Sequence, residues 1–345
     1  MKMNIRKNTS FVAVAVAVIV ILLSSVSGCA SSPTPAATNG APVPLAQAPA
    51  AQTQSQAAAA PERELTPQER WGIDKLIIVL LPGEDTPEMA YTRKVFDEAL
   101  SEVLGIPVEE YHGTNYAACI EAMRTGHAHV ALLGPFSYVH AVERAGAECF
   151  AVIGADGVHG YYSHFITHVD SDIHSLDDLK GRTFGFVDPA STSGYLVPSN
   201  DLLNHFESSL PDLEFEDLTV NGRFFSSVLF AGTHANSAQG VYRKDVEAAA
   251  VTSATVDAEI RNGHIPEGVL RTFHTSALIP ASPMVIQKDL PEDLKELVKN
   301  FFYEWDDQAF WDVRAPRNPA SRYFPVEDHE YDSIRQLRER FDLTD

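Results

Sequence analysis

Three stretches of the chain carry hydroxyl, phenol or imidazole side chains at places where a helix is expected to begin. They are HGTNYAA (112–118), DPASTSG (188–194) and AGTHAN (231–236). Thr114 or Asn115 and Thr233 can serve as helix caps in the first and third stretches. The side chains with the chemistry to bind a ligand are Tyr116, Ser191, Thr192, Ser193 and His234.

A helix N-terminus carries partial positive charge and unpaired N–H groups, so it binds oxyanions without a lysine or arginine. Neutral donors suit reversible capture, because they leave no uncompensated cation when the site empties. We therefore expect Ser191, Thr192 and Ser193 to hold a phosphate-like group. Serine and threonine are also the ordinary helix caps, so a single such cluster would indicate a structural role.

The overall charge of the chain argues against a nucleic-acid partner. Its 345 residues include 26 Lys and Arg against 47 Asp and Glu, a formal net charge of −21. Neutralising a phosphate backbone requires a basic surface, which this composition does not supply. A small molecule or a protein is the better expectation.

The N-terminus reads as a targeting segment. Lys2, Arg6 and Lys7 precede an uncharged apolar run over 11–26, and the sequence VSGC ends at Cys29. This pattern resembles the bacterial lipobox, in which the cysteine is lipidated; an uncleaved anchor helix is the alternative. We therefore expect a lipoprotein signal peptide over 1–28 and lipidation at Cys29. We also expect a disordered tether over 29–70, because residues 30–61 carry no charge and are rich in Ala, Pro, Gln, Ser and Thr.

The remaining cysteines and the histidines give no sign of a metal or cofactor. Cys119 and Cys149 are expected as free thiols, although an extracytoplasmic compartment permits a disulfide. A metal-binding receptor is conceivable from the pairs His127/His129 and His159/His164, but no zinc-type Cys/His spacing occurs. We therefore expect no metal and no cofactor.

Strand-like and helix-like segments alternate from residue 75 onward, a pattern typical of α/β domains with mostly parallel sheets. We expect strands over 76–81, 108–111, 129–133, 150–153, 165–169, 183–187, 246–251 and 284–286. The expected helices are 87–105, 115–125, 135–145 and 195–206, with an amphipathic helix within 316–342 packed against the first lobe. Such sheets place their ligand beyond the carboxyl ends of the strands, where these helices begin.

The motif DPASTSGYLVP (188–198) resembles the most specific motif of the phosphate/phosphite/phosphonate-binding subunits of ABC transporters. Four further segments match this family in the same order. They are GTNYAACIEAMRTGHAHVALLGP (113–135), GYYSHFITHVDSDIHSLDDLKGRTFGF (160–186), FAGTHANSAQGV (230–241) and LIPASPMVIQKDLP (278–291). Together they cover most of the chain from about 75 to 305.

The resemblance implies an α/β, type II periplasmic-binding-protein fold, with two lobes joined by a hinge of two crossing strands. Lobe 1 would comprise 71–168 and 279–345, and lobe 2 would comprise 169–278. It also implies a monomeric, extracytoplasmic solute-binding protein that delivers its ligand to an ABC permease and its ATPase and is no enzyme. Carried over residue by residue, the ligand contacts would be Tyr116, Tyr161, Ser191, Thr192, Ser193 and His234.

Two departures from the family pattern bear on the substrate. Where members that bind an aminoalkyl phosphonate would hold the ammonium with a carboxylate, this chain has Ser282, and the segment over 251–255 also lacks an acid. Desolvating an unpaired ammonium is costly. Phosphite, phosphate or a small uncharged alkylphosphonate therefore fits better than aminoethylphosphonate.

Two other functions remain open from the sequence. The same fold serves ligand-sensing receptors that report to a signalling partner, because both roles need the same closed state. An extracytoplasmic hydrolase could use Ser191 or Ser193 as nucleophile with His234 as base and Asp188 as orienter. Against the hydrolase, the motif lacks the Gly-x-Ser-x-Gly nucleophile elbow.

Overall fold

The computed structural model describes residues 63–83, 85–155, 159–318 and 320–343. The expected signal peptide, Cys29 and most of the expected tether lie outside the described residues. Within the described ranges, no helix combines the length and the apolar character that crossing a membrane requires.

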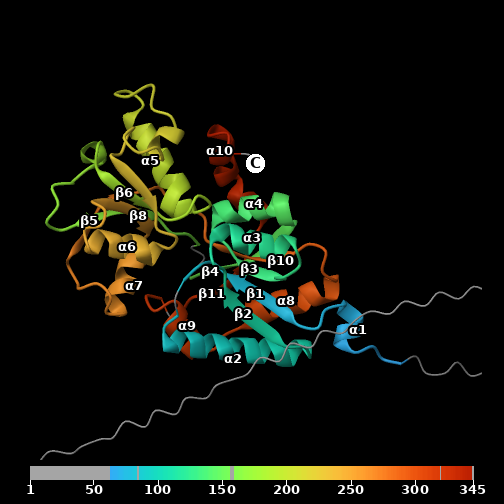
Figure 1. Cartoon of the computed structure of the whole chain (residues 1–345). Helices are drawn as coiled ribbons and strands as arrows, with labels where there is room; N and C mark the ends of the chain where they lie inside the picture. Colours follow the sequence, from blue (N-terminus) through green and yellow to red (C-terminus); the bar gives the residue numbers. More distant parts are fainter. Residues whose placement is uncertain (1–62, 84, 156–158, 319, 344–345) are drawn as a thin grey trace, which may run out of the picture. The chain divides into compact units, whose positions relative to one another are not determined.

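Lobe 1 is built on a six-stranded sheet in the order β11-β4-β10-β3-β1-β2. Strands β1, β2 and β3 are parallel to one another, whereas β10 pairs antiparallel with β3 and β4. In Figure 1, α2 and α8 lie along one side of the sheet, and α3 and α4 lie on the other. The elements are α1 (Pro67–Trp71), β1 (Leu76–Leu80), α2 (Pro87–Leu104), β2 (Val108–His112), α3 (Tyr116–Arg124), β3 (Val130–Leu132), α4 (Pro135–Ala145), β4 (Ala147–Gly154), β10 (Pro283–Gln287), α8 (Glu292–Glu304), α9 (Gln308–Arg314), β11 (Arg322–Pro325), η4 (Asp328–Tyr331) and α10 (Asp332–Arg340).

Lobe 2 is built on a five-stranded sheet in the order β7-β6-β8-β5-β9. The parallel strands β7, β6 and β8 are followed by helices, while β5 runs antiparallel to both of its neighbours. The elements are β5 (Ser163–His168), η1 (Leu176–Leu179), β6 (Thr183–Phe186), η2 (Thr192–Leu196), α5 (Val197–Phe206), η3 (Glu216–Leu218), β7 (Ser227–Phe230), α6 (His234–Tyr242), β8 (Ala248–Thr252), α7 (Thr255–Arg261) and β9 (Leu270–Thr275).

The strands and helices expected from the sequence appear within a few residues of their expected bounds. α2 shows why: Thr86 caps it by accepting the Met89 N–H, Pro87 opens it, and Gly105 ends it in a left-handed conformation. The strands missing from the expectation, β7, β9 and β11, all lie at sheet edges. An edge strand is partly exposed and lacks the continuous apolar run that marks a central strand.

The folded part begins before residue 70, where the tether was expected to end. Thr66 and Glu69 form a capping box that starts α1. Trp71 is buried in the core of lobe 1 and its indole N–H donates to Asp293 at 3.1 Å. These contacts fix the segment from about residue 66 to the domain, so the expected tether overlaps α1.

The chain passes into lobe 2 earlier than the boundary expected between residues 168 and 169. All of β5 pairs within the second sheet. The crossing segments meet at an isolated antiparallel bridge between Tyr161 and Ile279. Cys119 and Cys149 are free thiols, as the sequence predicted.

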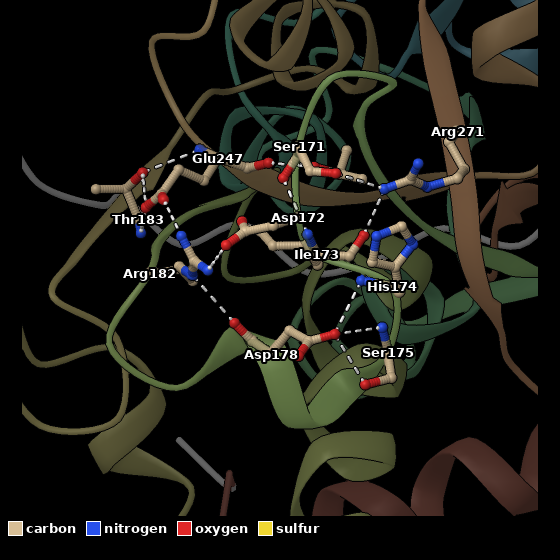
Figure 2. A network of polar contacts seen from close by, with 11 residues as sticks. Ser171, Asp172, Ile173, His174, Ser175, Asp178, Arg182, Thr183, Glu247 and Arg271 are labelled. Carbon is tan, nitrogen blue, oxygen red and sulfur yellow. Dashed lines mark hydrogen bonds and ion pairs between the residues drawn. The ribbon is translucent and has the colours of Figure 1, made fainter.

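An ion-pair network ties the strands of lobe 2 to the loop after β5 (Figure 2). Arg182 donates to Glu247 at 2.9 Å and to Asp172 at 2.8 Å. Glu247 also accepts the N–H of Thr183 at 2.8 Å, and Arg271 donates to backbone carbonyl oxygens of the same loop. Burial alone would raise the pKa of Glu247, but its hydrogen bonds from Thr183 and Arg182 outweigh this effect and lower the pKa.

Replacing Glu247→Gln should lower the free energy of unfolding by about 1 kcal/mol, because the hydrogen bonds to a charged acceptor are weakened. Urea denaturation at neutral pH measures the change. Since the folded-state pKa is lowered, this contribution should be present above the ordinary glutamate pKa and lost as the pH falls through the lowered value. Glu267→Gln, at an exposed site, is the matched control; equal effects of the two changes would contradict the role of the network.

Candidate ligand-binding site

The helix starts that carry the candidate donors lie at the carboxyl edges of the two sheets. In lobe 2, Phe186 and Phe230 are paired at the ends of β6 and β7, so the loops that follow them leave the sheet side by side. Gly232 N–H donates to the Val187 carbonyl at 2.7 Å and joins the two loops directly. In lobe 1, α3 and α4 follow β2 and β3 in the same way.

The loop over 188–194, here called the cradle loop, is held by its own hydrogen bonds. The Ser191 N–H donates to the Asp188 carbonyl at 2.9 Å, and the Ser191 hydroxyl accepts the Gly194 N–H at 3.1 Å. A Cβ atom at Gly194 would lie 2.3 Å from a methyl of Val187. Glycine is therefore required where this loop packs on the end of β6.

The cradle loop leads into η2, a short π-helical turn, and η2 continues into α5. The N–H groups of Thr192 and Ser193 belong to the first turn and so have no acceptor within the helix. The side chains of Ser191, Thr192 and Ser193 are all buried. This loop thus presents backbone and hydroxyl donors together, away from bulk water.

Two tyrosines from different segments meet the cradle loop. The hydroxyl of Tyr161 lies near those of Thr192, Ser193 and Ser282, and the hydroxyl of Tyr116 lies near that of Ser191. Burial raises the pKa of both phenols, and these neighbouring hydroxyls only partly oppose it. Both tyrosines therefore stay protonated at neutral pH and can donate to an oxyanion.

His234 lies in the first turn of α6 and is fixed as a neutral donor. Its Nδ1 accepts the Thr252 N–H at 3.1 Å, so in the neutral ring the proton is on Nε2. Burial lowers the pKa of His234 to about 4. His234 is thus hydrogen-bonded to the Thr252 backbone rather than to the hydroxyls around Tyr161.

The caps of α3 and α6 agree with the sequence prediction. Asn115 and Thr233 cap these helices by accepting the Ala118 and Asn236 N–H groups. The Asp188 carboxylate lies near the N–H of Tyr116, at the first turn of α3. A carboxylate is favourable at this positive end, so the start of α3 is less suited than the cradle loop to an external anion.

Asp188 does not act on His234 as the hydrolase alternative requires. Its carboxylate accepts the Ala190 N–H at 2.8 Å and lies near the Tyr116 N–H, while Nδ1 of His234 accepts the Thr252 N–H. Burial raises the pKa of Asp188, and these two N–H groups oppose the shift. A triad needs the carboxylate on the histidine, so this arrangement disfavours the hydrolase.

Hydrogen bonds join the cradle loop of lobe 2 to the first turn of α4 in lobe 1. The Phe136 N–H donates to the Thr192 hydroxyl oxygen at 2.9 Å. The Ser137 hydroxyl donates to the Ala190 carbonyl at 2.9 Å. Thr192 thereby supplies the side-chain cap that Gly134, at the N-cap of α4, lacks.

Sequence reasoning missed the residues that support the cradle loop. Besides Asp188 and Ser137, Ser163 donates to the Ser193 carbonyl at 2.6 Å from the start of β5. Ser137 and Ser163 bond to backbone atoms far away in the sequence, so no local pattern identifies them. Asp188 accepts the nearby Ala190 N–H, and its position directly before Pro189 at the start of the motif is a local turn signal.

A cavity of about 550 Å³ opens beside the cradle loop. Residues of both lobes line it, among them Asn115, Phe136, Asp188, Tyr195 and Leu343. Its wall includes the loop that joins β6 to η2. The cradle loop contributes Asp188 to Ala190 to this lining, whereas the residues expected to contact the ligand are not part of it.

Two α/β lobes joined through crossing segments, with buried hydroxyl donors where their helix starts meet, define a solute-binding protein of the type II periplasmic-binding-protein fold. A family model described as "ABC transporter, phosphonate, periplasmic substrate-binding protein" matches residues 78–331. The chain belongs to this family.

Individual relatives agree with the family. The chain is 33% identical over 217 residues to the phosphonates-binding periplasmic protein of Escherichia coli, a match covering 61% of this chain and 60% of that protein. It is 27% identical over 278 residues to the phosphate-import protein PhnD of Mycolicibacterium smegmatis, covering 76% of this chain and 85% of that one. The match thus spans less than two thirds of the first relative's length.

A solved structure supports the fold. The binding protein component of an ABC phosphonate transporter from Pseudomonas aeruginosa superposes with a TM-score of 0.67 at 27% identity, covering 78% of this chain and 88% of that chain. These relatives are named as binding or import proteins, in agreement with the expectation that the chain is no enzyme.

Because the pKa of His234 is lowered to about 4, the ring should remain the neutral Nε2–H tautomer from pH 5.5 to pH 8. Nitrogen chemical shifts of the labelled imidazole measure this directly. Since the unfolded histidine binds a proton near pH 6.5, the stability contributed by His234 should be complete above that value and decline as the pH falls toward 4. Titration of His234 near pH 6.5 in the folded protein would contradict its assigned environment.

Proposed function

We propose that the protein captures a small phosphorus oxyanion outside the cytoplasm and delivers it to an ABC importer. The observation that carries this proposal is the gathering of four hydroxyl groups, from Tyr161, Thr192, Ser193 and Ser282, at the start of η2. Family membership supplies the class of ligand.

The proposed mechanism is binding by neutral donors without chemistry on the ligand. The free N–H groups of the cradle loop and the hydroxyls of Ser191, Thr192 and Ser193 would each meet an oxygen of the anion. Tyr116 and Tyr161 would donate from lobe 1 and the crossing segment, and His234 from α6. Closure of the lobes would then shield the anion from water, where such hydrogen bonds are stronger.

The polar groups around Ser282 support a ligand without an ammonium group. Ser282 offers a neutral hydroxyl near that of Tyr161. The carboxylate within the cradle loop, Asp188, already accepts the Ala190 N–H. The names of the two relatives span phosphonates and phosphate, and we propose phosphite, phosphate or methylphosphonate as the preferred ligand.

Calorimetric titration of the protein, stripped of bound ligand by unfolding and refolding, tests the ligand class. Phosphite, phosphate or methylphosphonate should bind with a submicromolar Kd, and aminoethylphosphonate should bind at least about tenfold more weakly because its ammonium would be desolvated without a partner. Preferential binding of aminoethylphosphonate would contradict the interpretation of Ser282. If none of these four ligands bound, the proposed function would be contradicted.

The double change Ser191→Ala and Thr192→Ala should weaken binding of the best ligand about tenfold to a hundredfold, because hydrogen bonds to a charged group are lost. The same calorimetric titration measures the loss. Ser199→Ala is the matched control, since Ser199 is a buried serine on α5, which continues from η2, and its hydroxyl has no hydrogen-bond partner among the residues that the structure describes. Unchanged affinity in the double variant would exclude the cradle loop from the site.

We also propose that Cys29 is lipidated and anchors the protein to the membrane. The lipobox-like sequence before Cys29 supports this proposal. Cys29→Ala should abolish incorporation of labelled palmitate in cells and shift the protein out of the membrane fraction or leave it unprocessed. Continued lipid labelling of that variant would contradict the assignment.

A further inference from the structure

The last helix, α10, is firmly attached to lobe 1. The hydroxyl of Tyr331, directly before α10, donates to the Ala281 carbonyl at 3.0 Å, and its ring is fully buried against Tyr138 of α4. Arg338 pairs with Glu143 of α4 at 2.8 Å. Figure 1 shows α10 beside α4. The packing of α10 on lobe 1 was expected from the sequence.

The C-terminal end of α10 also contacts lobe 2, which the sequence analysis did not anticipate. One nitrogen of Arg340, Nη1, donates to the side-chain oxygens of Asn200 at 2.8 Å and Asn204 at 2.9 Å, both on α5. The ring of Phe341 stacks on Phe215 with centroids 4.7 Å apart and an interplanar angle of 28°. The helix therefore bridges the two lobes.

These lobe 2 contacts lead directly to the cradle loop. Phe215 packs edge-on against Tyr195, with centroids 5.2 Å apart. Tyr195 belongs to η2, the turn that begins with Thr192 and Ser193. An unbroken row of aromatic contacts thus connects Phe341 to the element that carries the candidate donors.

The contacts of α10 with lobe 1 are more deeply buried than its contacts with lobe 2. On lobe 1, Tyr331, Ile334 and Arg338 are buried. On lobe 2, Arg340 is exposed and Phe341 is only partly buried. Separation of the lobes would therefore break the lobe 2 contacts first and leave α10 on lobe 1.

We propose that α10 is a strap that favours the closed arrangement of the lobes before any ligand arrives, through Arg340 and Phe341. Neither residue belongs to the candidate ligand site. The strap contributes to affinity indirectly, because a ligand that requires the closed arrangement binds more tightly when that arrangement is more populated.

Amide hydrogen exchange in the ligand-free protein tests the strap. The Phe136 N–H donates across the lobes to Thr192, so its exchange reports opening of the cleft. In Arg340→Ala and in Phe341→Ala, the Phe136 amide should exchange about threefold to tenfold faster than in the wild type, as expected for the loss of one such contact. Residue-resolved exchange by NMR on the full chain gives the rate.

Arg335→Ala is the matched control. Arg335 lies on the same helix, but its partners Asp328 and Asp332 belong to η4 and α10 themselves. This variant should leave the Phe136 exchange rate unchanged. An unchanged rate in Arg340→Ala and Phe341→Ala, or an equal increase in Arg335→Ala, would overturn the proposal, as would an increase fully explained by a fall in global unfolding free energy.

The effect on affinity rests on the proposed function and is measured separately. The ligand that binds the wild type best should bind Arg340→Ala and Phe341→Ala more weakly, by the factor by which the closed population falls, with faster dissociation in stopped flow. A change in exchange without ligand binding by the wild type would support the strap and refute the proposed function. A fall in the closed population, obtained from the Phe136 exchange, with unaltered affinity would overturn the coupling between them.

Discussion

The hydrogen bond from the Phe136 N–H to the Thr192 hydroxyl joins the first turn of α4 to the cradle loop, and the candidate site depends on this junction. The candidate site is shared by lobe 1, lobe 2 and the crossing segments, with most of its donors from the cradle loop of lobe 2. Buried donors are costly unless they are paired. The Thr192 hydroxyl meets this requirement at one point, because its oxygen accepts the Phe136 N–H of α4. Its own proton remains available to donate.

Asp188 organises the place where we propose that this acidic protein binds an anion. Its carboxylate lies at the first turn of α3. The same carboxylate accepts the Ala190 N–H and so orders the cradle loop. The remaining donors are neutral, and in the proposed function their number and spacing, rather than net charge, would select the ligand.

The bridging position of α10 and the aromatic row through Phe215 and Tyr195 give the two lobes a connection apart from the crossing segments. The proposed ligand contacts and the lobe contacts share η2. A change in lobe position would therefore reach the proposed donors, since Ser191 to Ser193 and Tyr195 belong to one continuous turn and its cap.

The sequence by itself determined the alternation of strands and helices, the helix starts and the motif DPASTSGYLVP, because caps, glycine stops and apolar runs are local signals. It also proposed Tyr116, Tyr161 and Ser191 to Ser193 as ligand contacts, and the structure brings these residues close together. Only the tertiary structure decided the edge strands β7, β9 and β11, the partner of His234 at Thr252, the place of Asp188 on α3 and the bridge made by α10. These features join backbone or side-chain groups distant in the sequence, and such pairings depend on how the sheets and helices pack rather than on any local pattern.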